Sequence, residues 1–173
     1  KKVSNANYLW ISYFYSYLNE TGRAGFVMSS QASSAGREEA AVRRKLIETG
    51  AVDIMIDIRG NFFYTRTVPC QLWFLDRAKE KDEARRDYVL MIDARNIYRK
   101  VSRAIYDFSP EQQKNIAAIV WLYRGQSERY LKLQTPSVRR AHAPQAKTYG
   151  TSCDSPWLQS LKIWSLRQTR SGS

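Results

Sequence analysis

Two apolar segments separated by a short aromatic turn constrain the fold of this chain more than any other feature. Residues 52–58 (VDIMIDI) alternate branched apolar side chains with other residue types, which is the two-residue period of a β-strand. Residues 68–75 (VPCQLWFL) form a second apolar run, and Pro69 is tolerated near its start because the first residues of a strand need not donate to a ladder. We therefore predict two strands, with a turn at 59–61 after the first.

Helical segments and further apolar runs surround this pair of strands. Acidic residues come early in 37–49 and basic residues come late, the order that the helix dipole favours. Ser109 and Gln112 complete a capping box at the start of another helix. This order of elements predicts an α/β fold. The surrounding segments are a helix over 7–18, a buried strand over 24–29, the helix over 37–49, a solvated loop or short helix over 76–87, a strand over 88–92 and a helix from 110 that ends at Gly125.

The charge of the chain indicates an anionic partner such as nucleic acid. Its 173 residues suit one domain, and 28 basic against 16 acidic side chains give a net charge of +12. Residues 1–133 hold 22 basic and 15 acidic groups, or +7, and residues 134–173 hold 6 basic groups and one acidic group, or +5. A solvated surface with an arbitrary excess of charge is the alternative interpretation.

Several classes of protein are excluded by simple features. No run of 18 apolar residues predicts a membrane span, and no secretory leader is visible. Cys70 and Cys153 lie far apart in unlike contexts, so neither a disulfide nor a metal site is indicated and we expect a cytoplasmic setting. The chain begins at Lys1 rather than Met, so we expect it to be a piece of a longer protein.

The residues that usually carry catalysis are scarce. The single histidine, His142, lies in an irregular region, and no glycine-rich phosphate loop is present. Asp53 and Asp57 would share one face of their strand about 13 Å apart, at roughly 3.3 Å per residue, too far for joint proton transfer. We interpret both as polar-face residues, with Asp57 the better functional candidate because it lies near the carboxyl end of its strand.

The aromatic turn is the most informative segment for function. Phe62, Phe63 and Tyr64 follow one another between two apolar strands, so at least one of them should face the end of the sheet. An exposed aromatic ring beside Arg59 and Arg66 suits stacking on a base while the guanidinium groups meet phosphate. The alternative is that these rings only cap the hydrophobic end of the sheet.

A succession of motifs resembles the methylation subunit of type I restriction–modification systems, which are adenine-N6 DNA methyltransferases. The resemblance covers residues 5 to about 130, and the order of the motifs is more specific than any one of them. The matching segments are 5–10 (NANYLW), 22–27 (GRAGFV), 42–48 (VRRKLIE), 52–58, 60–75 (GNFFYTRTVPCQLWFL), 92–95 (IDAR) and the helix near 116–125.

This resemblance implies part of a Rossmann-like, S-adenosylmethionine-dependent methyltransferase fold: the last strands of the sheet and a C-terminal helix. The strand at 68–75 would run antiparallel between those at 24–29 and 52–58. The reaction implied is methyl transfer from S-adenosylmethionine to N6 of an adenine that is flipped out of the duplex. The family also implies partners, namely DNA and the specificity and restriction subunits of a type I complex.

The resemblance also assigns candidate site residues. Aligned with the family's base-binding loop, Phe63 stacks on the flipped base, with Phe62 and Tyr64 as fallbacks. The DNA-contacting candidates in the same loop are Arg59, Asn61 and Arg66.

Two family motifs are absent from the sequence: the glycine-rich cofactor motif and the Asn-Pro-Pro-Phe type catalytic loop. Both are expected upstream of Lys1, so no catalytic residue is assigned. Residues 1–133 are predicted to be the carboxyl half of the catalytic domain, inactive alone and a poor binder of S-adenosylmethionine. The alternatives are a catalytically dead nucleic-acid-binding module and a non-functional truncated remnant.

Residues 134–173 lose the resemblance. They hold three of the five prolines and many Ser, Gln and Arg residues. We expect a poorly ordered or atypical tail, unrelated or frame-shifted, with one short amphipathic helix around 157–166.

Overall fold

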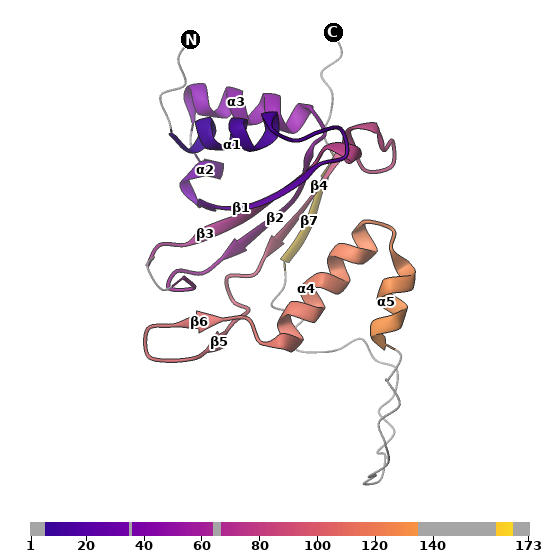
Figure 1. Cartoon of the computed structure of the whole chain (residues 1–173). Coiled ribbons are helices and arrows are strands. Elements are labelled where there is room, and N and C mark those ends of the chain that lie inside the picture. Colours follow the sequence, from indigo (N-terminus) through magenta and orange to yellow (C-terminus); the bar gives the residue numbers. More distant parts are fainter. Residues whose placement is uncertain (1–5, 35, 64–66, 135–161, 168–173) are drawn as a thin grey trace.

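A five-stranded sheet in the order β1-β3-β2-β4-β7 forms the centre of the protein (Figure 1). The structure, a computed structural model, describes residues 6–34, 36–63, 67–134 and 162–167. The strands of this sheet are β1 (Arg23–Ser29), β2 (Val52–Ile58), β3 (Cys70–Asp76), β4 (Tyr88–Asp93) and β7 (Lys162–Arg167). The helices are α1 (Ala6–Ser16), α2 (Gln31–Ser34), α3 (Arg37–Glu48), a 3-10 helix (Arg77–Lys81), α4 (Pro110–Tyr123) and α5 (Ser127–Gln134). A two-stranded hairpin of β5 (Arg99–Lys100) and β6 (Tyr106–Asp107) stands apart from the sheet.

The topology confirms the expected place of the second apolar segment. Strand β3 runs antiparallel to both of its neighbours, β1 and β2, and β2 runs parallel to β4. Strands β1, β2 and β4 therefore end at one edge of the sheet, which is also where β3 begins. In an α/β sheet this edge is the usual place for a ligand.

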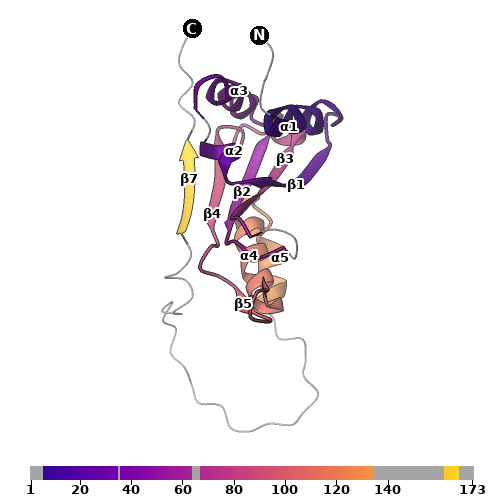
Figure 2. The ribbon, with the colours of Figure 1, turned by 90° about the vertical axis from the view of Figure 1, so that its left-hand side faces the viewer.

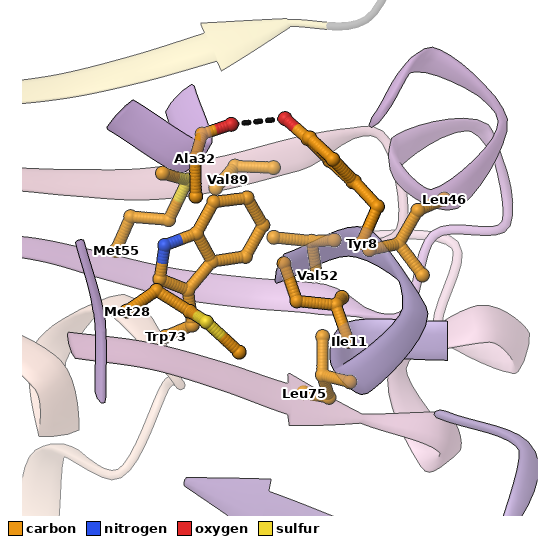
Figure 3. Close-up of a cluster of buried hydrophobic side chains, with 10 residues drawn as sticks. All are labelled: Tyr8, Ile11, Met28, Ala32, Leu46, Val52, Met55, Trp73, Leu75 and Val89. Atoms are coloured by element: carbon orange, nitrogen blue, oxygen red, sulfur yellow. Dashed lines mark hydrogen bonds between the residues drawn. The ribbon is translucent and has the colours of Figure 1, made fainter. Parts of the chain in front are cut away.

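One face of the sheet is covered by α1 and α3 (Figures 1 and 2). Trp73 and Tyr8 are fully buried there, among the side chains drawn in Figure 3. The hydroxyl of Tyr8 donates to the carbonyl of Ala32 and so fixes α1 to α2. Phe26 stacks on both Phe14 and Trp73, so an aromatic side chain of α1 packs onto this face through β1. The predicted helix at 7–18 is thus confirmed over nearly its whole length.

The opposite face is covered by α4. The buried side chains on this face form a second hydrophobic core, separate from the one around Trp73. Ile54, Ile56 and Ile92 lie at its centre, and Ile116 packs onto them from α4. The predicted helix start is confirmed, because the Ser109 side chain accepts from the Gln112 amide while the Gln112 side chain accepts from the Ser109 amide. No helix in the described part of the chain is long and apolar enough to cross a membrane.

The regular alternation predicted for 52–58 is broken by a bulge at Asp53. Val52 pairs with Leu75 and Ile54 pairs with Phe74, so Asp53 is an extra residue on β2. Asp53 is fully buried and contacts Arg124, whereas Asp57 contacts Gln71 on the side of Trp73. The prediction that both aspartates share one polar face is therefore wrong, because the bulge turns one of them toward α4.

Two segments are buried differently from what their composition predicts. Strand β1 was expected to be buried, but only Met28 is, and Val27 is 46% exposed because β1 lies at the end of the strand order. The charged segment 76–87 forms a 3-10 helix in which Lys79 is fully buried. Its ammonium donates to the carbonyls of Gly50 and Val52 at 2.9 and 2.8 Å, which compensates for the loss of water.

The far end of the chain adds a strand rather than the predicted amphipathic helix. Residues 162–167 form β7, antiparallel to β4, with Ile163 opposite Ile92 and Leu166 opposite Val89. The unpaired edge of β4 offers backbone hydrogen bonds that a helix could not use, so pairing overrides the helical spacing. The expected boundary at residue 133 remains a prediction, and 135–161 and 168–173 lie outside the described residues.

Candidate functional site

A cleft of about 630 Å³ opens where β1 and β2 end and β3 begins. It collects residues from four separate parts of the chain: the start of α1, the end of β1, the loop after β2 and the approach to β3. The residues that line it are Asn7, Val27, Met28, Ser29, Phe63, Val68 and Cys70. Apolar walls with a few polar groups suit a planar, partly polar ligand.

The structure separates the two phenylalanines of the aromatic turn. Both rings pack against the core on the α4 side of the sheet, but of the two Phe63 lines the cleft. The ring of Phe62 lies 4.5 Å from the ring of Phe108, on the side of the second core, and meets Phe63 edge to face at 5.8 Å. Phe62 is therefore a packing residue and is not among the described residues that line the cleft. Tyr64 and Arg66, the other two predicted residues of this loop, lie outside the described residues.

The backbone of the turn explains how Phe63 reaches the cleft. Asn61 has a φ of 60°, the left-handed conformation that Asn adopts more readily than most residues. Gly60 lies so close to the carbonyl of Thr67 that a Cβ at this position would clash with it. These two residues allow the chain to reverse tightly, so that the incoming and outgoing ends of the loop lie against each other.

Arg59 is held by aromatic rings. Its guanidinium carbon lies 4.0 Å from the centroid of the Tyr98 ring and 3.7 Å from that of Tyr106, and these two rings meet edge to face at 5.1 Å. The Tyr106 amide also donates to the Asn61 carbonyl at 3.2 Å. The turn that carries Phe63 is thus attached to the β5–β6 hairpin, and the role of Arg59 and Asn61 as DNA contacts stays a prediction.

A polar network lies at the same edge of the sheet. The Gln71 amide nitrogen donates to Asp57 at 2.6 Å and to the Ser33 hydroxyl at 2.7 Å, and its oxygen accepts from the Trp73 indole at 3.2 Å. Sequence reasoning singled out Asp57 but missed Gln71, because a glutamine within an apolar run has no signal of its own. Asn7 was also missed as a lining residue, although it lies within the 5–10 motif.

A second group of charges lies at the other end of β2. The Arg124 guanidinium contacts buried Asp53 from α4, and Arg85 lies 3.7 Å from the other carboxylate oxygen. Burial lowers the pKa of Lys79 to about 8, although the charge of Asp53 acts in the opposite direction. Burial also raises the pKa of the Tyr123 hydroxyl, and the charge of Asp53 adds to that effect. This group holds α4 against the sheet and lines no part of the cleft.

The described residues that line the cleft lack the groups expected of an S-adenosylmethionine site. Nucleoside cofactors are commonly held by a carboxylate at the ribose and by a glycine-rich turn. None of the described residues that line the cleft is acidic, and the sequence contains no glycine-rich motif of that kind. The described residues of the cleft therefore include none of these cofactor-binding groups.

Comparison with protein families finds one match that covers most of the chain. The family model described as N-6 DNA methylase matches residues 1–139. A type I restriction enzyme MjaIX methylase subunit from Methanocaldococcus jannaschii is 38% identical over 112 residues, which are 65% of this chain and 20% of that protein. The HindI methylase subunit from Haemophilus influenzae is 30% identical over 114 residues, which are 65% of this chain and 25% of that protein. The chain thus spans about a fifth to a quarter of the length of these relatives.

Solved structures show the same fold. A type I restriction–modification methyltransferase subunit from Streptococcus thermophilus superposes with a TM-score of 0.62 at 21% identity, over 69% of this chain and 24% of that one. The M protein of the type I restriction enzyme EcoKI superposes with a TM-score of 0.51 at 20% identity, over 63% of this chain and 23% of that one. These likenesses confirm the α/β architecture with its antiparallel strand between parallel neighbours.

Proposed function

We propose, since this chain belongs to the N-6 DNA methylase family, that residues 1–133 form the carboxyl half of the catalytic domain of a type I restriction–modification methylase subunit. That subunit would transfer a methyl group from S-adenosylmethionine to N6 of adenine in DNA. The named relatives, both methylase subunits of type I restriction enzymes, support this assignment. The part played by this chain is to receive the flipped adenine.

The observation that carries the proposal is the position of Phe63. Its ring lines a cleft at the edge of the sheet where α/β proteins bind ligands. A base taken out of the duplex is commonly stacked on an aromatic side chain in a pocket of this kind. Phe62 packs against Phe108 instead, so Phe63 is the better candidate for the stacking ring.

The partners follow from the same proposal. DNA would approach the cleft, and the specificity and restriction subunits of a type I complex would join the full-length protein. A cytoplasmic setting belongs to this proposal because the substrate is DNA. The cofactor would be bound by the other half of the catalytic domain, since the residues lining this cleft do not suit it.

The methyl-transfer part of the proposal is tested by incubating the 173-residue chain with duplex DNA and radiolabelled S-adenosylmethionine. We expect no incorporation, because the sequence contains neither the glycine-rich motif nor the Asn-Pro-Pro-Phe type loop. Incorporation above that of heat-treated protein would show that the chain carries a complete active site and would contradict the division of the domain.

The base-binding part is tested with two DNA duplexes that differ only in whether one adenine is unpaired. The chain should prefer the unpaired adenine, and Phe63→Ala should weaken that preference by about 1–3 kcal/mol, the usual contribution of one stacked base. Phe62→Ala is the matched control, because it removes the same kind of ring from a residue that packs on Phe108 and is not among the described residues lining the cleft. Equal loss in both variants, or loss only in the control, would exclude Phe63 as the stacking residue.

A further inference from the structure

We propose that the β5–β6 hairpin, residues 98–107, is a phosphate-binding arm that holds duplex DNA beside the cleft. This inference rests on the proposed function, because it names a second surface by which the same DNA is held. The hairpin follows β4, and the Ala94 amide donates to the Asp57 carbonyl at 2.9 Å where the chain leaves the sheet. It therefore starts from the edge of the sheet at which β2 and β4 end (Figure 1), and the cleft opens at this edge.

The hairpin is basic, and one of its cations is held in an ion pair whereas two others are exposed. Residues 98–107 hold three basic side chains and one acidic side chain, a net charge of +2. Arg99 forms a bidentate ion pair with Asp107 across the hairpin, at 2.9 and 2.6 Å, which ties its two strands together. Lys100 and Arg103 are exposed and form no ion pair with any residue that the structure describes.

Free cations at the tip of a hairpin suit a phosphate backbone. Lysine, arginine and serine side chains all donate to phosphate oxygens in protein–DNA complexes, and Ser102 lies between the two cations in the sequence. A surface for an acidic protein would need similar charge, but it would not need to lie next to a cleft suited to a base. The shared location of Phe63 and the hairpin favours DNA.

The attachment of the hairpin to the turn gives the arm a fixed position. Arg59, between the rings of Tyr98 and Tyr106, joins the base of the hairpin to the turn that carries Phe63. The Tyr106 amide and the Asn61 carbonyl form a backbone hydrogen bond between the same two segments. A contact with phosphate at the tip is thus set at a constant distance from the cleft, as the capture of one nucleotide requires.

The experiment compares two double variants of the 173-residue chain that lose the same charge. Lys100→Ala with Arg103→Ala removes the free cations of the hairpin, whereas Arg44→Ala with Lys45→Ala removes two exposed cations of α3. Affinity for a labelled duplex is measured by fluorescence anisotropy over a range of salt concentrations. Circular dichroism checks that each variant is folded.

We expect the hairpin variant to bind about tenfold or more weakly at about 0.1 M salt, and the slope of log K against log[salt] to fall by about 2. The α3 variant should keep the slope of the unaltered chain. An unchanged slope in the hairpin variant, an equal change in both variants, or no binding of duplex by the unaltered chain would overturn the proposal. Tighter binding to polyglutamate than to DNA, lost in the hairpin variant, would assign the arm to an acidic protein instead.

The same measurements separate this inference from the proposed function. The hairpin variant should bind the duplex with the paired adenine and the duplex with the unpaired adenine more weakly by the same factor, since phosphate contacts do not depend on the base. Phe63→Ala should change only the preference between the two duplexes. If the hairpin variant binds both duplexes as tightly as the unaltered chain, the proposed arm is excluded. If Phe63→Ala leaves the preference for the unpaired adenine unchanged, the base-binding role of Phe63 is excluded.

Discussion

Arg124 donates from both Nε and Nη2, at 2.9 and 2.6 Å, to one carboxylate oxygen of Asp53, a side chain with no exposed surface. The pair joins the C-terminal cap of α4, Arg124, to the bulge in β2. A buried carboxylate must be compensated by charge and hydrogen bonds, so the two elements depend on each other.

Arg124→Met should lower the free energy of unfolding by about 3–5 kcal/mol, because it leaves Asp53 buried without its main partner. Urea denaturation measures this cost. The control is Lys81→Met, which breaks the ion pair between Lys81 and Glu20. The two charged atoms of this pair also lie 2.6 Å apart, but the side chains of Lys81 and Glu20 are 72% and 78% exposed. The control should leave the unfolding midpoint almost unchanged. Similar shifts in both variants would show that burial does not determine the strength of the pair.

Gly60→Ala should disrupt the turn that carries Phe63, because the added methyl group would meet the Thr67 carbonyl. We expect the preference for an unpaired adenine to fall at least as much as in Phe63→Ala, together with lower thermal stability. Gly36→Ala is the matched control, since a Cβ there would meet no atom within 4 Å. Normal base preference in the Gly60 variant would mean that the turn can relax without moving Phe63.

Lys79 should make stability depend on pH in the alkaline range. Burial lowers the pKa of its ammonium to about 8 from the ordinary 10.5, so between these values the unfolded chain holds a proton that the folded chain has released. Raising the pH therefore favours the folded state through this group. The unfolding free energy of the unaltered chain minus that of Lys79→Met should rise by about 2 kcal/mol from about pH 7.5 to 9.5. A constant or shrinking difference would contradict the lowered pKa.

Arg59→Lys should loosen the link between the turn and the hairpin while keeping the charge. An ammonium cannot stack on Tyr98 and Tyr106 as the planar guanidinium does. Hydrogen exchange of the Tyr106 amide, which donates to Asn61, should become about five- to tenfold faster, equivalent to about 1 kcal/mol. Arg103→Lys, at the free tip, should leave that exchange rate unchanged. If neither variant changes it, the stacking does not hold the hairpin.

Local patterns in the sequence were sufficient for most of the fold. The period of 52–58, the charge order of 37–49 and the capping box at Ser109 each depend on neighbours within a few residues, and each predicted element is present. The place of β3 between β1 and β2 could be predicted only from the resemblance to a family, because no single segment determines the order of the strands.

The features that were missed depend on contacts between distant residues. The bulge at Asp53 is set by pairing with β3 and by Arg124 on α4, and the burial of Lys79 by carbonyls from the start of β2. The sequence did not decide which of the three aromatic residues of the turn would face the cleft. The structure shows that Phe63 lines the cleft, whereas Phe62 packs on Phe108. Tertiary contacts decide such details after local propensity has been satisfied.

Strand β4 ends at Asp93, whereas its partner β7 begins at Lys162. During synthesis the outer edge of β4 therefore emerges long before the segment that covers it. At a typical rate of about 5–20 residues per second, this edge stays open for several seconds on the ribosome. A nascent chain with such an edge can pair with another strand, so chaperones that bind extended segments should act on this protein before β7 is made.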